Sequence, residues 1–213
     1  MPLRQIDTLS PKCQTALVTS TETSKSDGIL DSSLAVFCRY GFQKTSMLDI
    51  AQAAGMSRAT LYLHFKNKED VFRSGAIRTH AKVMNIVETE LSRSSAVFER
   101  VEAALVVYFS GLMEEISASP HGSELFDASA ELVGDVARDT RRELIRLIAA
   151  ALIAADDAGE IELSRLGVSN EQLAILIIAA VDGLKHGGAT SMPVRSGVAL
   201  QLQLVQVAVD KTR

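Results

Sequence analysis

The chain has little of what enzymes and metalloproteins use. Its 213 residues include no tryptophan, two cysteines, four prolines and four histidines. Two cysteines, Cys13 and Cys38, are too few for a disulfide framework or a thiolate metal site. The histidines lack metal-ligand spacing, and we find no Ser/His/Asp set or glycine-rich phosphate loop. We therefore expect no enzymatic activity, no cofactor and no metal. Whether Cys13 or Cys38 has a redox role stays open.

Long apolar runs are also missing. The most apolar stretch, AILIIAAV, is too short to cross a bilayer, and MPLRQIDTLS has no signal-peptide core. We therefore expect a cytoplasmic protein. The formal net charge of −4 argues against a general polyanion binder. The length suffices for two packed units, and the low proline content favours a helix-rich, all-α fold.

The most informative part of the chain follows residue 26. Residues 1–26 are rich in serine and threonine without a sustained period, and we predict a flexible N-terminal arm there. Asp27 can cap a first helix, and Gly41 can end it in the left-handed conformation. These signals predict a compact domain over residues 27–72.

Two further helices are predicted inside this domain. Thr45 or Ser46 can cap a helix over residues 47–54, and Gly55 supplies a tight turn. Ser57 can then cap a third helix over residues 58–65. This spacing indicates a helix-turn-helix, which presents its last helix to the major groove of DNA.

The outward side chains of this unit suit a nucleic acid. Arginine binds base edges or phosphates in a bidentate manner, and hydroxyl groups bind phosphate oxygens. His64 could instead be a packing residue, and Tyr62 could be partly buried. We predict that DNA is contacted by Lys44, Thr45, Ser46, Ser57, Arg58, Ala59, Thr60, Tyr62, His64 and Lys68.

Two segments, GFQKTSMLDIA and QAAGMSRATLYLHFKNKEDVF, resemble the DNA-binding domain of the TetR/AcrR family of transcriptional regulators. The chain departs mildly from the family pattern, with Met56 where valine is usual and Ala59 where glycine is frequent. The resemblance is specific over about residues 27–72. It implies an all-helical homodimer with an N-terminal helix-turn-helix domain and a C-terminal effector-binding domain.

We predict that residues 73–213 form the helical effector-binding and dimerisation domain. A helix over 68–92 would link it to the DNA-binding domain, and further helices are expected over 96–118 and 124–155, the latter with a break near Gly134. The mainly aliphatic interior favours a hydrophobic or amphipathic small molecule, although such stripes are often plain core. The candidate pocket residues are Phe109, Met113, Phe126, Leu144, Ile148, Ile178 and Asp182.

The last two helices carry more apolar surface than one contact requires. Ser169 and Gln172 form a capping box before one helix, and the final helix over 196–211 has two apolar stripes. One stripe could pack within the subunit while the other meets a partner, or both could serve a monomeric core. The candidate interface residues are Leu173, Ile177, Leu184, Leu200, Leu202, Val205 and Val209.

These observations together predict a sequence-specific DNA-binding regulator. The resemblance favours a repressor that a small ligand releases from a palindromic operator, with double-stranded DNA, a second copy of the chain and an unknown effector as partners. Two alternatives stay open, namely a helical dimeric partner-binding protein without DNA activity and a TetR-like activator.

Overall fold

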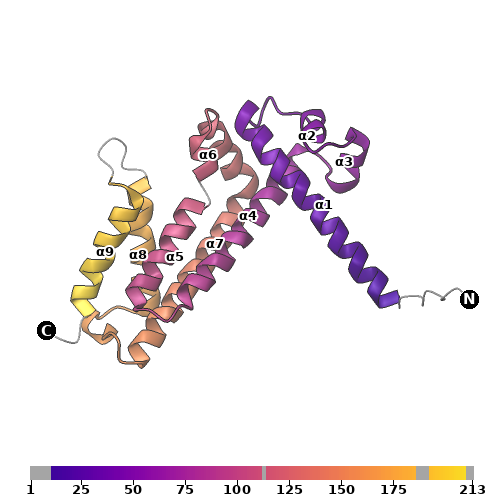
Figure 1. The fold of residues 1–213 in the computed structure, drawn as a ribbon. Coiled ribbons are helices and arrows are strands. Elements are labelled where there is room, and N and C mark those ends of the chain that lie inside the picture. Colours follow the sequence, from indigo (N-terminus) through magenta and orange to yellow (C-terminus); the bar gives the residue numbers. More distant parts are fainter. Residues whose placement is uncertain (1–10, 112–113, 186–191, 210–213) are drawn as a thin grey trace, which may run out of the picture. The chain divides into compact units, whose positions relative to one another are not determined.

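The computed structural model describes residues 11–111, 114–185 and 192–209, with side chains in the ranges 25–111, 116–183 and 192–209. In these ranges the chain is helical and contains no strand, which confirms the predicted all-α class (Figure 1). The elements are α1 (Pro11–Tyr40), α2 (Met47–Ala53), α3 (Arg58–His64), α4 (Lys68–Leu91), α5 (Val97–Gly111), α6 (Glu114–Ala118), α7 (Gly122–Asp157), a short 3-10 helix η1 (Leu163–Leu166), α8 (Asn170–Lys185) and α9 (Val194–Val209).

The chain divides into two compact units. The first contains residues through Gly75 together with Ser119–Ala128, and the second contains Ala76–Ala118 and the residues from Ser129 onward. The sequence assigns 119–128 to the effector domain, so the structure differs here. The physical reason is a hydrogen bond between residues far apart in the sequence, because Ser119 Oγ donates to the carbonyl oxygen of Cys38 at 2.7 Å.

An aromatic cluster fills the first unit. Phe37, Phe42 and Phe72 pack with ring centroids 5.3 to 5.7 Å apart. Ile50 of α2 and Leu61 of α3 are fully buried. This core fixes the helix-turn-helix, formed by α2 and α3, against α1 and the start of α4.

The start of α1 differs from the prediction. Asp27 lies inside the helix, which begins at Pro11, so the predicted cap at Asp27 is wrong. Pro11 suits the first position of a helix, because the backbone N–H of that residue makes no hydrogen bond within the helix and proline lacks this group. Between Lys12 and Asp27 the sequence has neither proline nor glycine to stop the helix. The flexibility predicted for residues 1–26 stays a prediction.

Most other helix boundaries follow the sequence. Asn67 accepts a hydrogen bond from the Asp70 N–H at 2.8 Å at the start of α4. The Asp70 carboxylate accepts from the N–H of Lys66 at 2.9 Å, one residue before the cap. α7 runs through Gly134 without a break, so that prediction is wrong; a glycine inside a helix costs only about 1 kcal/mol, which packing of the surrounding turns can supply.

A single apolar cluster fills the second unit. Val97, Val101, Leu105 and Tyr108 line the buried face of α5. The helix expected over 96–118 is described as α5 and α6, and residues 112–113 lie outside the described residues. α8 and α9 pack directly on one another and on the rest of this core (Figure 1). Of the helices described, none is long and apolar enough to span a membrane.

Candidate nucleic-acid interface

The first helix of the helix-turn-helix starts with a reciprocal cap. Ser46 is extended, and its Oγ accepts a hydrogen bond from the Asp49 N–H at 3.3 Å. The Asp49 carboxylate in turn accepts from the Ser46 N–H at 2.8 Å and from the Ser46 hydroxyl at 2.6 Å. These hydrogen bonds lower the pKa of Asp49. The cap of α2 is therefore Ser46, which resolves the choice between Thr45 and Ser46.

Thr45 has a different place from the one predicted. Its side chain is buried, and its hydroxyl donates to the carbonyl oxygen of Gly41 at 2.6 Å. The hydroxyl thus closes the turn before α2. The prediction that Thr45 contacts DNA is not supported by this geometry, because the group is shielded and already partnered.

The turn between α2 and α3 has the expected form. Gly55 has a φ of +66°, where a side chain would be strained, and the Met56 N–H donates to the carbonyl of Ala51 at 2.9 Å. Ser57 caps α3 by accepting from the Thr60 N–H at 3.1 Å. The Ser57 and Thr60 hydroxyl groups also lie within hydrogen-bond distance, at 2.8 Å.

Two predicted contact residues form a stacked pair on α3. Arg58 Nη2 donates to the Tyr62 hydroxyl at 3.2 Å, and its guanidinium lies 5.4 Å from the centre of the Tyr62 ring. Both side chains are exposed. The stack limits the rotamers of two long side chains before any partner arrives, which lowers the entropy cost of a later contact.

The sequence interpretation missed Leu63. This side chain is 84% exposed, whereas Leu61 of the same helix is fully buried. A signal was present, because Leu61 and Phe65 define the inward face and Leu63 lies on the opposite side of an ideal helix. His64 is only half-buried at the flank, with its ring centroid 6.4 Å from that of Phe65.

Lys68 forms hydrogen bonds with backbone groups of the first unit. Its Nζ donates to the carbonyl oxygens of Phe42 and Gln43, at 2.8 and 3.0 Å, and lies 4.6 Å from the centre of the Phe42 ring. The predicted phosphate contact by Lys68 would have to compete with these partners. Lys44, by contrast, lies exposed in the same turn.

The predicted pocket residues have different surroundings, and their role as a ligand pocket stays a prediction. Phe109, Leu144, Ile148 and Ile178 are packed into the core of the second unit, whereas Phe126 belongs to the first unit and is 36% exposed. Asp182 is half-buried and forms an ion pair with Arg141. Met113 lies outside the described residues.

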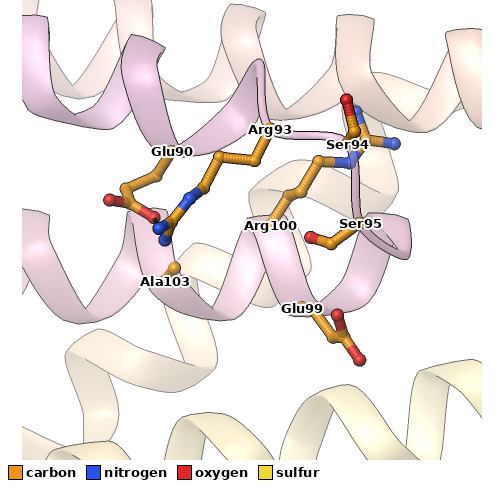
Figure 2. Close-up of a pocket in the computed structure, with 7 residues that line it drawn as sticks. All are labelled: Glu90, Arg93, Ser94, Ser95, Glu99, Arg100 and Ala103. Carbon is orange, nitrogen blue, oxygen red and sulfur yellow. Dashed lines mark hydrogen bonds and ion pairs between the residues drawn. The ribbon is translucent and has the colours of Figure 1, made fainter.

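A cavity of about 430 Å³ lies elsewhere in the second unit, and none of the predicted pocket residues lines it (Figure 2). It sits between the end of α4 and the start of α5, where Arg93 reaches back toward Glu90 at 2.6 Å. Arg100 is tied to the Leu91 carbonyl at 3.1 Å and to Glu160 at 3.6 Å. These partners make the cavity a polar junction of helix ends. Among the described residues no group of acidic, histidine or cysteine side chains could hold a metal ion.

The predicted interface residues divide between two faces. Leu173, Ile177, Leu202 and Val209 are buried in the core of their own unit, so they are not free to meet a partner in this structure. Leu200 is 47% exposed and Val205 is partly buried. The side chain of Leu184 lies outside the described ranges.

Comparison with known proteins gives the same picture. Residues 29–74 match the family model described as bacterial regulatory proteins, tetR family. The chain is 33% identical over 86 residues to the HTH-type transcriptional repressor ComR of Escherichia coli, covering 40% of each chain. It is 48% identical over 44 residues to the regulator AcrR of Shigella flexneri, covering 21% of this chain and 20% of AcrR. The alignments therefore span well under half of these curated relatives.

Solved structures extend the similarity to the whole fold. SmeT, the repressor of the Stenotrophomonas maltophilia multidrug efflux pump SmeDEF, is 24% identical with a TM-score of 0.63, covering 88% of this chain and 91% of SmeT. A SmeT–triclosan complex matches with a TM-score of 0.61 at 22% identity, covering 89% of this chain and 93% of that one. By these matches, residues 29–74 are similar to the tetR family of bacterial regulatory proteins, and the chain as a whole shares its helical fold with SmeT.

Proposed function

We propose that this protein is a sequence-specific DNA-binding transcriptional regulator that acts as a repressor. The observation that carries the proposal is the capped helix-turn-helix, in which α3 presents Arg58, Thr60 and Tyr62 on its exposed side. Lys44 and Ser46 lie exposed at the start of α2. A phosphate there could contact the Lys44 ammonium and the backbone of the turn before α2. The relatives ComR and SmeT are both described as repressors, which supports the sign of the regulation.

A second copy of the chain is the proposed partner of α8 and α9. One side of this helix pair packs into its own core, and the other side leaves large apolar side chains in water. Their exposed fractions are 41% for Ile175, 58% for Leu176, 47% for Leu200, 67% for Leu204 and 56% for Val207. Apolar area of this extent favours a two-fold contact between identical helix pairs. A two-fold dimer would in turn recognise a palindromic operator.

The ligand-release step is proposed to use the second unit. Its interior is aliphatic. Arg141 and Asp182, both partly exposed, form an ion pair at the edge of this interior, and burial raises the pKa of the neighbouring Tyr108 hydroxyl. A polar group beside an aliphatic core suits an amphipathic ligand. SmeT has been solved with triclosan, which supports a small-molecule effector for this fold. A ligand that prefers a conformation of this unit in which the chain binds DNA weakly would shift the population toward that conformation. The ligand would thereby lower the affinity for DNA.

The test is a random-sequence selection with the full chain, followed by fluorescence anisotropy on the selected duplex across a salt series. We expect one palindromic sequence and an affinity that falls steeply with salt. Arg58→Ala should weaken binding by about 1–3 kcal/mol while the dimer persists. A selection that enriches no sequence would contradict the proposal and favour a helical partner-binding protein without DNA activity.

A further inference from the structure

Leu63 is the most exposed large hydrophobic side chain among the described residues. It is 84% exposed, compared with 67% for Leu204 on the helix pair proposed for dimerisation. A scattered surface leucine is ordinary in soluble proteins. Leu63 differs by its position, because it lies on α3, the helix that the proposed function places in the major groove.

The direction of Leu63 follows from the helix itself. Leu61 is fully buried and Phe65 is 7% exposed, and these two residues mark the inward side of α3. At 100° per residue, Leu63 and Ala59 lie one turn apart on the side opposite to that inward face. Ala59 is exposed as well. We call these two residues the apolar strip.

Polar groups flank the apolar strip on both sides. Arg58 and Tyr62 are stacked on one side, and Ser57 and Thr60 lie on the other. Nearby exposed lysines, Lys44 and Lys66, add positive charge. An apolar surface of a partner protein would cover these cations and hydroxyls and leave them without hydrogen-bond or charge partners. Duplex DNA satisfies both features, since its phosphates match the charges and its major groove offers one apolar group, the C5-methyl of thymine.

We propose that the apolar strip reads thymine methyl groups in each operator half-site, with Leu63 as the principal contact. The inference rests on the proposed function and adds a specificity-determining residue to it. Arginine at position 58 selects hydrogen-bonding base edges, whereas Leu63 selects A·T over G·C pairs by burying a methyl group. Burial of one methyl group is worth about a three- to fivefold change in affinity.

The experiment replaces each thymine of the selected operator, one at a time, by deoxyuridine. This change removes only the C5-methyl and keeps every hydrogen-bonding group of the base. The wild-type chain and Leu63→Ala are titrated against each duplex by anisotropy. Ile86→Ala serves as the control, because Ile86 is an apolar residue of α4 that is 47% exposed. Circular dichroism and size-exclusion chromatography check that both variants fold and keep the oligomeric state.

We expect the wild type and Ile86→Ala to lose about three- to fivefold in affinity at one or two symmetry-related thymines. Leu63→Ala should bind the unmodified operator correspondingly less well and should be indifferent to deoxyuridine at those positions. Three results would overturn the inference: a wild type indifferent to every deoxyuridine, a Leu63→Ala variant with the full loss, or a changed oligomeric state in that variant. A selection that yields no operator would instead contradict the proposed function itself.

Discussion

Lys68 and Glu124 hold the same short segment of backbone by groups of opposite charge. The Lys68 ammonium donates to the carbonyl oxygens of Phe42 and Gln43, at 2.8 and 3.0 Å. The Glu124 carboxylate accepts from the N–H of Gln43 at 2.5 Å. The segment joins α1 to α2, so the two side chains, 56 positions apart in sequence, fix the entry into the helix-turn-helix.

We predict that Lys68 acts on DNA affinity through this segment, while Lys44 acts by direct contact. Lys44→Ala should lower affinity and reduce the slope of log affinity against log salt by about one, as expected for one lost phosphate contact. Lys68→Ala should lower affinity with an unchanged slope, because the loss arises from a displaced turn. Anisotropy titrations at four or five salt concentrations measure both quantities. Equal loss of slope in both variants would restore Lys68 as a phosphate ligand.

Gly41 ends α1 with a φ of +81°, and a Cβ there would collide with the Glu124 carboxylate. Gly41→Ala should destabilise the protein by at least about 1–2 kcal/mol, the cost of a left-handed backbone in an L-residue. Gly28 is the matched control, since it lies inside α1 and a Cβ there meets nothing within 4 Å. Gly28→Ala should gain up to about 1 kcal/mol from helix propensity. Urea unfolding midpoints of the two variants should therefore move in opposite directions.

The capping box at α2 predicts a pH dependence of stability. The pKa of Asp49 is lowered from 3.8 by its hydrogen bonds to Ser46, so the folded state favours the carboxylate. A depressed folded-state pKa stabilises the protein above the unfolded pKa, and this contribution is lost as the pH falls through the folded value. Asp49→Asn should be less stable than wild type at neutral pH. The difference should shrink below pH 3.8, as measured by urea unfolding at a series of pH values. A difference independent of pH would contradict this role of the Asp49 carboxylate.

The two apolar stripes of α9 should respond differently to a charge. Leu204 is 67% exposed, so Leu204→Glu should leave the fold intact and convert the proposed dimer into monomers. Leu202 is 2% exposed, so Leu202→Glu should bury an unpaired charge and cost about 3–5 kcal/mol of stability. Light scattering after size exclusion reports the mass, and thermal unfolding reports the stability. A Leu204→Glu variant that retains the mass of the wild type would place any dimer contact elsewhere.

The sequence predicted local structure well where short-range chemistry decides it. Ser46, Ser57 and Ser169 each place an oxygen where the first N–H groups of a helix need an acceptor. Gly41 and Gly55 both adopt a positive φ at the expected helix ends. These preferences depend on a few neighbouring residues, so they can be read without knowing the fold. Asp27 is the exception, because a possible cap does not start a helix when the preceding residues also favour helix.

Roles that depend on distant residues could not be read in this way. Lys68 has the chemistry of a phosphate ligand, but the fold gives it internal carbonyl partners at Phe42 and Gln43. Leu173 and Leu202 have the pattern of interface residues, but they pack into the core of their own unit. Periodicity shows that a helix has two apolar faces, and it does not show which face the rest of the chain covers.

The sequence by itself therefore determined most helix ends, the serine caps and the helix-turn-helix, because each depends on contacts within one or two turns. The tertiary structure alone decided which polar groups remain free. It placed Glu124 against the turn before α2 and Lys68 on the carbonyls of that turn. The reason is that burial and hydrogen-bond competition are set by residues far apart in sequence, which only the folded chain brings together.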